Sequence, residues 1–461
     1  MSKIHAVVLA AGQGTRMKSK LYKVLHPVCG KPMVQHVVDT LGNMQVEEIV
    51  VVVGHGADAV RAKLGEDITY ALQEEQLGTA HAVSKAAPFL QDKEGTTFLL
   101  YGDVPLLSAQ TLSDLLRYHE EQQAAATVLT AVLPDPTGYG RIVRNESGEV
   151  LRIVEHKDAS DEERAVREIN TGIYCYDNRK LWKALAEVKN DNVQGEYYVT
   201  DCVAILRDAG EKVVAFEAKD PDETMGVNDR VQLSEAEVYM RKRIAATHMR
   251  NGVTIIDPSS TYIEADVMIG SDTVIEPGTH LRGRTTIGAD CVIGPQVDLT
   301  NVELADDVSI TYSVMVDASV DAETTIGPYA YIRPGTQIGR NAKVGDFVEL
   351  KNAKIGDGTK VPHLSYVGDA EIGDGVNIGC GTITVNYDGA VKHKTIVQDG
   401  AFIGCNTNLV APVTVGQNAY VAAGSTINQD VPDNALAIAR ERQVNKLDYA
   451  SKMPRKGKKQ S

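Results

Sequence analysis

The chain changes its pattern of apolar residues near residue 250. Before that point, runs that are apolar throughout alternate with stretches of helical spacing. The apolar runs are IHAVVLA (4–10), EIVVVVG (48–54), TTFLLYG (96–102) and ATVLTAVL (126–133), and helical stretches lie at 33–44 and 112–123. Strands that are apolar along their whole length are typical of a parallel sheet covered by helices on both faces. Residues 1–229 are therefore predicted to form an α/β domain.

One long helix is predicted over residues 230–250. This segment contains no Gly or Pro, and Leu233, Ala236, Met240 and Ile244 recur at helical spacing. A helix at this place can belong to a core or connect two domains. We interpret it as a linker helix, because a different pattern begins directly after it.

Residues 251–461 carry a repeat of period six. The aliphatic positions form three blocks: Ile269, Ile275, Leu281, Ile287, Ile293 and Leu299; Ile326, Ile332, Ile338, Val344 and Leu350; and Ile403, Leu409, Val415, Val421 and Ile427. Short strands with one inward aliphatic residue and a turn every six residues predict a parallel β-helix of triangular section. The breaks near 301–320 and 381–400 are predicted to be loops that project from it.

Composition and charge narrow the class of protein. Hydrophobic residues make up 43% and charged residues 24%, and the formal charge is −15, which disfavours a polyanionic partner such as nucleic acid. There is no apolar run long enough to span a membrane and no signal-peptide layout at the start. The six cysteines show no CxxC spacing and predict reduced thiols rather than disulfides or a zinc site. We therefore expect a cytoplasmic protein.

A glycine-rich turn follows the first predicted strand. It reads Leu9-Ala10-Ala11-Gly12-Gln-Gly14-Thr-Arg16, with Lys23 shortly after. A third fingerprint glycine and a Gly-Lys-Ser/Thr are both missing, which excludes a dinucleotide fingerprint and a P-loop. Backbone N–H groups with two cations suit a triphosphate whose pyrophosphate leaves. The alternative is a tight strand–helix turn with surface cations.

An acidic residue ends another apolar strand, in Tyr101-Gly102-Asp103-Val-Pro. Open α/β sheets bind ligands at the carboxyl ends of their strands, so Asp103 is a candidate Mg²⁺ ligand. Asn228 in Gly-Val-Asn-Asp is the candidate for a second oxygen ligand. Taken alone, Asp103 can equally be a turn or helix-capping residue.

These motifs, with GTAHAV (78–83), GYGRIV (138–143) and INTGIY (169–174), resemble the sugar-1-phosphate nucleotidyltransferases. The resemblance implies a Rossmann-like domain with Arg16 and Lys23 as catalytic cations on the phosphates, and Asp103 and Asn228 as metal ligands. It further implies contacts to a nucleotide sugar from Leu9, Ala10, Ala11, Gly12, Lys23, Gln73, Gly78, Thr79, Tyr101, Gly102, Asp103, Gly140, Glu155, Asn170 and Asn228.

The period-six region also carries polar residues outside its aliphatic ladder. Alone, such a β-helix can be an oligomerising post. However, HLSYVGD (363–369) and GTITVNYDG (381–389) resemble the hexapeptide acetyltransferases, which implies a left-handed β-helix and His363 as the catalytic base. By that resemblance Arg333, Lys351, Tyr366 and Asn377 bind a sugar phosphate, and Glu349 supports His363.

The same resemblance implies a second binding surface, for acetyl-CoA. Its residues are Cys380, Asn386, Tyr387, Cys405, Ala423 and Arg440. Cys380 and Cys405 stand where other relatives carry Ala and Ser, and neither is predicted to be a nucleophile. The basic tail, with Lys452, Arg455, Lys456, Lys458 and Lys459, is interpreted as a solvated, disordered tail rather than a clamp for coenzyme A phosphates.

Together the two halves resemble the bifunctional N-acetylglucosamine-1-phosphate uridyltransferase / glucosamine-1-phosphate acetyltransferase family over residues 4–446. The resemblance implies a homotrimer that uses acetyl-CoA, UTP and Mg²⁺ to make UDP-N-acetylglucosamine for cell-envelope polysaccharide. The expected domains are a uridyltransferase at 1–229, a linker helix at 230–250 and an acetyltransferase at 251–461. The alternatives are a nucleotidyltransferase with a structural β-helix, and a binding protein with degenerate sites.

Overall fold

Residues 3–453 are described by a computed structural model of the protein, which divides the chain into two units at residues 244 and 245. Of the basic tail, only Lys452 falls among these residues, in the short helix η4 (Tyr449–Lys452). Arg455, Lys456, Lys458 and Lys459 lie outside them. Within residues 3–453, none of the helices combines the length and the apolar character that crossing a bilayer requires.

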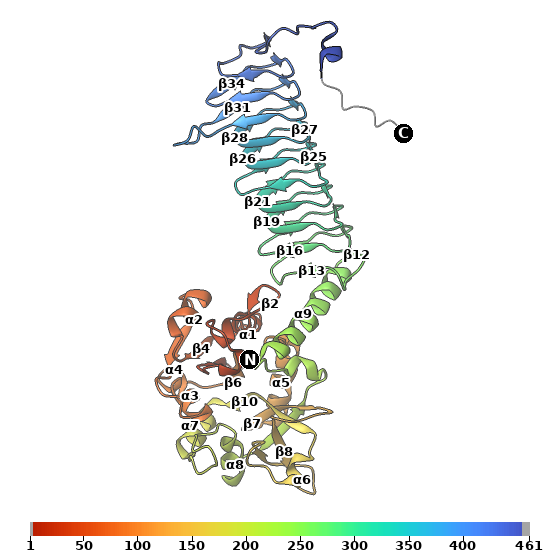
Figure 1. Cartoon of the computed structure of the whole chain (residues 1–461). Helices are drawn as coiled ribbons and strands as arrows, with labels where there is room; N and C mark the ends of the chain where they lie inside the picture. Colours follow the sequence, from red (N-terminus) through yellow and green to blue (C-terminus); the bar gives the residue numbers. More distant parts are fainter. Residues whose placement is uncertain (1–2, 454–461) are drawn as a thin grey trace. The chain divides into compact units, whose positions relative to one another are not determined.

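The first unit is built on a mixed sheet (Figure 1). Its strand order is β11 (Val213–Glu217), β7 (Ala126–Val132), β10 (Glu168–Asp177), β6 (Thr96–Tyr101), β1 (Ile4–Ala10), β4 (Glu48–Val53) and β5 (Thr69–Leu72). The prediction of a parallel sheet is wrong at β10, which runs antiparallel to both β6 and β7. The hairpin of β8 (Gly140–Arg144) and β9 (Val150–Val154) lies beside it, with β8 paired to β10. An antiparallel strand needs no crossover helix, and so the alternation of strand and helix that predicted a parallel sheet stops here.

Helices cover both faces of this sheet, as its apolar strands require. Two buried clusters result, one containing Val7, Val50 and Leu99 and the other Val8, Val51 and Leu100, so successive residues of one strand serve opposite faces. The helices are α1 (Met33–Gly42), α2 (Ala57–Leu64), α3 (Thr79–Ser84), α4 (Ala87–Leu90), α5 (Ala109–Gln122), α6 (Asp161–Arg164), α7 (Asn178–Glu187) and α8 (Asp201–Asp208), with η1 (Thr15–Met17), η2 (Lys23–Leu25), η3 (Pro221–Thr224) and the short pair β2 (Pro27–Val28) and β3 (Lys31–Pro32).

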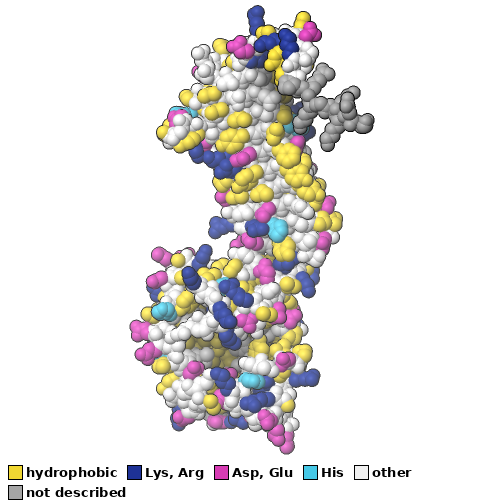
Figure 2. Space-filling view, in the orientation of Figure 1, with side chains coloured by type: hydrophobic (Ala, Val, Ile, Leu, Met, Phe, Trp, Pro, Cys, Tyr) yellow, Lys and Arg dark blue, Asp and Glu magenta, His cyan; other side chains and the backbone are white. Residues whose placement is uncertain are grey.

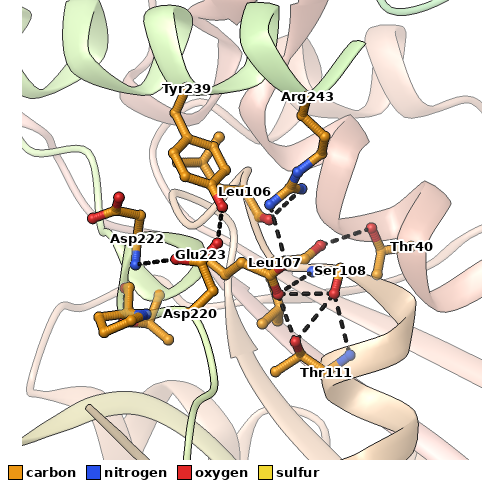
Figure 3. A network of polar contacts seen from close by, with 12 residues as sticks. Thr40, Leu106, Leu107, Ser108, Thr111, Asp220, Asp222, Glu223, Tyr239 and Arg243 are labelled. Carbon is orange, nitrogen blue, oxygen red and sulfur yellow. Dashed lines mark hydrogen bonds and ion pairs between the residues drawn. The ribbon is translucent and has the colours of Figure 1, made fainter. Parts of the chain in front are cut away.

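A helix, α9, spans Arg230–Arg250. The part of α9 that belongs to the first unit, up to Ile244, is held by the polar network of Figure 3, centred on the Glu223 carboxylate. This carboxylate accepts hydrogen bonds from Ser108 Oγ at 2.8 Å and Thr111 Oγ1 at 2.6 Å, and pairs with Arg243 at 3.2 Å. The Tyr239 hydroxyl donates to Asp220. Asn228 lies in the segment between Asp220 and α9. The contacts of Asp220 and Glu223 with α9 hold this segment at both of its ends.

The second unit is a left-handed parallel β-helix with three faces (Figure 1). The first face is formed by β12 (Thr254–Ile255), β15 (Val274–Ile275), β18 (Val292–Ile293), β20 (Ser309–Ile310), β22 (Thr325–Ile326), β25 (Lys343–Asp346), β27 (Lys360–His363), β29 (Asn377–Ile378), β32 (Phe402–Ile403), β35 (Tyr420–Val421) and β37 (Leu436–Ala437). The second contains β13 (Tyr262–Ile263), β16 (His280–Arg282), β19 (Asp298–Leu304), β21 (Val314–Val320), β23 (Tyr331–Ile332), β26 (Glu349–Ile355), β28 (Tyr366–Ile372), β30 (Ile383–Val385), β33 (Asn408–Val410) and β36 (Thr426–Ile427). The third contains β14 (Met268–Ile269), β17 (Thr286–Ile287), β24 (Gln337–Ile338), β31 (Thr395–Val397) and β34 (Val413–Val415), and the long strands β19, β21, β26 and β28 continue into it.

The predicted aliphatic ladder is the core of this unit. All its members are buried except Ile269, which is half-buried. Each coil stacks on the next through parallel pairs such as Ile275↔Ile293 and Leu281↔Leu299, so these rungs bury apolar side chains against one another. This confirms the parallel β-helix.

One of the two predicted loops is wrong. Residues 301–320 do not project, because β19 and β21 pair in register from Asp298↔Val314 to Leu304↔Val320 and pass the corner between two faces as continuous strands. The second break does contain a loop, between β30 and β31, where Tyr387 bridges Lys392. The coil that holds this loop has its register partners Asn377 and Phe402 25 positions apart, against 18 for Phe402 and Tyr420 in the next coil.

The first unit is expected to lose stability in mild acid because of His119. This side chain on α5 is buried, with Nδ1 2.8 Å from Thr127 Oγ1, and burial lowers its pKa from 6.5 to about 4. The unfolded chain binds the proton first as pH falls, so the stabilisation present above pH 6.5 disappears toward pH 4. Replacing His119 with Gln should reduce the stability lost between about pH 7 and about pH 5 by about 2 kcal/mol. Urea unfolding followed by the fluorescence of Trp182, the chain's one tryptophan, measures this, and an unchanged pH slope would contradict it.

Candidate active sites

The glycine turn after β1 brings the backbone and Lys23 together. Gly14 has φ +60°, and a Cβ there would lie 2.4 Å from Lys23 Cβ, so a side chain at this position would displace the lysine. A Cβ on Gly12 would meet nothing within 4 Å. The turn therefore packs on one side against Lys23 and is open on the other, where a ligand can approach the backbone.

Lys23, Asp103 and Asn228 meet at the carboxyl ends of the strands. The Lys23 ammonium donates to the Asp103 carboxylate and, at 2.8 Å, to Asn228 Oδ1. Arg16 Nη2 donates to the same Asn228 oxygen at 2.8 Å, and Val227 N donates to the Asp103 carbonyl at 2.9 Å. The Lys23 and Asp103 side chains are only 12% and 17% exposed, so water screens this pair weakly. An acidic and an amide oxygen thus already converge on one cation.

A cavity of ≈ 340 Å³ opens beside this cluster. Most of the predicted nucleotide-sugar residues line it, namely Leu9, Ala10, Ala11, Gly12, Lys23, Gln73, Gly78, Thr79, Tyr101, Asp103 and Asn228. Sequence reasoning missed four further lining residues, Val24, Gln76, Ala82 and Glu196. Gln76 belongs to the same loop as Gln73, which is the signal that could have found it. Glu196 comes from a distant segment, and no sequence signal pointed to it.

The other predicted residues of this site lie around Tyr101. Gly140 and Asn170 are register partners in β8 and β10, and Gly102 N donates to the Leu9 carbonyl at 2.9 Å. Burial raises the pKa of Glu155, whose carboxylate accepts a hydrogen bond from Thr200 Oγ1 at 3.4 Å. Burial also raises the pKa of Tyr101, and the Glu155 charge adds to that rise. The arrangement offers carboxyl, amide and phenol groups, which can hydrogen-bond to hydroxyls of a ligand.

In the second unit, His363 has a carboxylate partner. Asp346 and His363 are register partners in β25 and β27, and His363 Nδ1 lies 2.6 Å from Asp346 Oδ1. The hydrogen bond to His363 lowers the pKa of Asp346, so the carboxylate is an acceptor and Nδ1 carries the proton. The Nε2 lone pair is therefore available to accept another proton. The expectation that Glu349 supports His363 is wrong, because Glu349 Oε1 accepts from Arg333 Nη1 at 2.7 Å instead.

Three cations gather on the second face of the β-helix, Arg333, Lys351 and Lys392. Lys351 lies beside Lys392, whose ammonium lowers the pKa of Lys351, and Arg333 adds a smaller effect in the same direction. Sequence reasoning found Arg333 and Lys351 but missed Lys392, which lies in the loop between β30 and β31. Like charges held together favour binding of an anion, because it relieves their repulsion.

Tyr366 and Asn386 form a second polar group. Asn386 Nδ2 donates to Asp369 Oδ2 at 2.6 Å and to the Tyr366 hydroxyl at 3.3 Å, and Asp369 was not predicted from the sequence. Tyr387 is exposed and donates to the Gly389 carbonyl at 2.7 Å. Asn377 lies on the first face, between Lys360 and Phe402, whereas Tyr366 lies on the second. The structure therefore does not join all four predicted sugar-phosphate residues on one face.

Four of the six predicted acetyl-CoA residues follow first-face strands, whereas Asn386 and Tyr387 follow β30 on the second face. Cys380, Cys405 and Ala423 follow β29, β32 and β35, and Arg440 Cδ lies 3.8 Å from the position of a Cβ on Gly424. Cys405, Ala423 and Arg440 are exposed, and Cys380 is half-buried. His363, 56% exposed, ends β27 on the same face, so this surface is open to solvent.

Comparisons with known proteins match the two units of the chain to two different families. The nucleotidyl transferase family matches residues 5–223, and the bacterial transferase hexapeptide family (six repeats) matches residues 260–301, 317–352 and 394–429. The bifunctional protein GlmU of Brevibacillus brevis is 87% identical over 461 residues, which is 100% of both chains. Those of Geobacillus sp. (strain WCH70) and Geobacillus thermodenitrificans are each 58% identical, over 98% and 100% of this chain and 99% and 100% of their own. Both matched families are transferases, and the chain belongs to the bifunctional GlmU family.

Proposed function

We propose that this enzyme makes UDP-N-acetylglucosamine in two steps. The β-helix transfers an acetyl group from acetyl-CoA to glucosamine 1-phosphate, and the first unit then transfers uridylyl from UTP to the product. The observation that carries this proposal is that one chain holds a cavity ending at Lys23, Asp103 and Asn228 and, in its β-helix, both a His363–Asp346 pair and a cluster of three cations. The first suits phosphoryl chemistry, and the second suits proton removal next to a bound phosphate.

In the uridylyl step, a sugar-phosphate oxygen attacks the α-phosphorus of UTP and the bond to pyrophosphate breaks. Little covalent chemistry falls to the protein, so catalysis is positioning and charge stabilisation. Arg16 and Lys23 neutralise the phosphates, while the backbone at Gly12 approaches them without a side chain in the way. Glu155 and Asn170 orient hydroxyl groups of the ligand.

Magnesium fits this site by its donor set, since oxygens of Asp103 and Asn228 already share one cation, the Lys23 ammonium. In this proposal Asp103 and Asn228 hold Mg²⁺, and the ion supplies charge stabilisation for the phosphates. Lys23 is then released from the carboxylate and can bind a phosphate oxygen.

In the acetyl step, the glucosamine amine attacks the thioester carbonyl, and the bond to the coenzyme A sulfur breaks. His363 Nε2 accepts the proton that the amine loses and returns it to the departing thiolate, so no net proton remains on the enzyme. Asp346 keeps the opposite ring nitrogen protonated. Arg333, Lys351 and Lys392 hold the sugar phosphate.

We further propose a homotrimer that brings a second copy over the open β-helix site. The support is an exposed column of side chains next to Asp346 and His363, formed by Tyr312, Tyr329, Phe347 and Leu364 and here called the apolar ridge. The Tyr329 and Phe347 rings stack with their centroids 5.4 Å apart, the Tyr312 and Tyr329 rings are tilted at 5.7 Å, and the four side chains are 39–61% exposed. Hydrophobic side chains also show on the surface of the β-helix in Figure 2. Exposed ridges of this kind mark association surfaces.

The proposed division of labour is a uridyltransferase at 1–229, a linker helix at 230–250 and an acetyltransferase at 251–461. Because UTP and acetyl-CoA are metabolites of the cell interior, we propose that the enzyme works in the cytoplasm and supplies cell-envelope polysaccharide.

The decisive test is release of free thiol from acetyl-CoA with glucosamine 1-phosphate present. The proposal expects thiol release that depends on the sugar phosphate, together with pyrophosphate release from UTP and N-acetylglucosamine 1-phosphate. Pyrophosphate release without thiol release would instead identify a nucleotidyltransferase with a structural β-helix.

The role of Lys392 is tested by Lys392→Ala. Loss of one charge-assisted contact should raise KM for glucosamine 1-phosphate by about tenfold or more, with a smaller change in kcat. Lys394→Ala is the matched control, since Lys394 lies two residues away and pairs with Glu371 at 2.6 Å. An equal KM change in both variants would show a general effect of charge on this loop.

A further inference from the structure

One corner of the β-helix carries the same turn position on successive coils. Lys360, Asn377, Phe402 and Tyr420 are register partners, and the residues three positions after them are His363, Cys380, Cys405 and Ala423. Asp346 pairs with His363 on the preceding coil. Asp346, His363, Cys380, Cys405 and Ala423 are here called the corner column.

The turns of the corner column share one backbone geometry. The residue after each member has positive φ, namely Phe347 (57°), Leu364 (39°), Gly381 (76°), Asn406 (55°) and Gly424 (74°). The coils are also bonded to each other here, because Asn406 N donates to the Cys380 carbonyl at 2.7 Å and Gly424 N donates to the Cys405 carbonyl at 2.8 Å. The two cysteines therefore occupy equivalent places on adjacent coils.

This spacing meets the requirement for a disulfide bond. Hydrogen-bonded parallel strands lie about 4.8 Å apart, and disulfides join residues whose Cα atoms are about 4.4–6.8 Å apart. Side chains of the corner column do reach the neighbouring coil, as the 2.6 Å contact of Asp346 with His363 shows. No change of register is needed to bring the Cys380 and Cys405 sulfurs together.

Accessibility separates these two thiols from the other four. Cys405 is exposed and Cys380 is half-buried, whereas Cys29, Cys175, Cys202 and Cys291 are buried. Burial raises the pKa of Cys175, Cys202 and Cys291, which suppresses their reactive thiolate forms. An oxidant in solution therefore reacts first at the corner column.

We propose that Cys380 and Cys405 are a modification site, a thiol pair that low-molecular-weight disulfides convert into a reversible disulfide across two coils. The Cys405 thiolate attacks the reagent disulfide and releases one reagent thiol. The Cys380 thiolate then attacks the mixed disulfide at Cys405 and releases the second. The protein loses two protons and two electrons, and the reagent disulfide gains them as two thiols.

The expected consequence is loss of acetyl transfer, and this part rests on the proposed function. The disulfide lies directly after His363 in the corner column and within the surface proposed for acetyl-CoA. It ties together two turns that must accept the thioester beside the base. A small displacement of reacting groups can slow catalysis by about 10²-fold, so oxidation should lower acetyl transfer by about tenfold or more and spare uridylyl transfer.

The experiment treats the full-length enzyme with oxidised glutathione and measures the disulfide and the activities separately. Peptide mass spectrometry should find the Cys380 and Cys405 peptides joined, and a reducing agent should separate them and restore acetyl transfer. The controls are Cys380→Ala and Cys405→Ser, each compared with its own reduced form. Neither variant should form the cross-link, and each should instead carry a mixed disulfide with glutathione at its remaining thiol.

The outcomes distinguish the two proposals. Stable glutathione adducts on both cysteines without a cross-link, or a cross-link between subunits on a non-reducing gel, would overturn the cross-coil disulfide. A disulfide that forms while acetyl transfer stays unchanged would establish the thiol pair and overturn its place in the acetyl-CoA site. Absence of acetyl transfer in the fully reduced enzyme would refute the proposed function and leave the mass-spectrometric result valid by itself.

Discussion

Replacing His363 with alanine is expected to lower kcat for acetyl transfer by about 10²–10⁴-fold, the usual contribution of a positioned general base. The amine must lose a proton as the C–N bond forms, and Nε2 is the free acceptor because Asp346 engages Nδ1. The fold should survive, since Val361 and Val367, not His363, supply the buried rungs around it. The measurement is thiol release from acetyl-CoA at saturating substrates, with uridylyl transfer assayed on the same preparation.

Asp346→Asn is the matched test of how His363 is held. An amide can donate its N–H to Nδ1, which would move the imidazole proton to Nε2 and remove the base. The variant should therefore lose kcat with little change in KM for either substrate. A His363→Ala enzyme that keeps more than about a tenth of its kcat would show that another group takes the proton.

Replacing Asp103 with alanine is expected to lower uridylyl transfer by about 10²–10³-fold and to leave acetyl transfer near its original rate. Asp103 supplies the carboxylate that meets Lys23 and the proposed metal ligand Asn228, and loss of one charge-stabilising group in a closed site has an effect of this size. Pyrophosphate release from UTP and N-acetylglucosamine 1-phosphate measures it over a range of Mg²⁺ concentrations.

The two cores explain why the second activity should persist. The first unit folds around its own sheet and the second around its aliphatic ladder, and the chain divides between them at residues 244 and 245. Asp39→Ala is the control, because Asp39 also pairs with a lysine, Lys31 at 2.6 Å, but does not line the cavity. Equal loss of both activities in a folded Asp103→Ala enzyme would contradict independent sites.

Local pattern was enough to predict much of this fold. A β-helix coil repeats its steric and hydrophobic demands every six residues, so the ladder through Ile275, Leu281 and Ile293 was readable without knowing any distant contact. The strand ending at Asp103 and the glycine turn at Gly12 and Gly14 were equally local, and resemblance then related them to Asn228. The antiparallel direction of β10 could not be predicted from local pattern, because the direction in which a strand joins a sheet is set by its neighbours in space.

What the sequence determined by itself is therefore the architecture of two units and the residue types available for chemistry. Only the tertiary structure decided which of them meet: Asp346 rather than Glu349 beside His363, Lys392 beside Lys351, and Cys405 on the coil next to Cys380. The physical reason is that contacts between coils depend on the number of residues in a whole turn of the helix. That number is 17 from Lys360 to Asn377 and 25 from Asn377 to Phe402. A single loop or a missing corner therefore changes which residues are neighbours on adjacent coils, although the six-residue pattern stays the same.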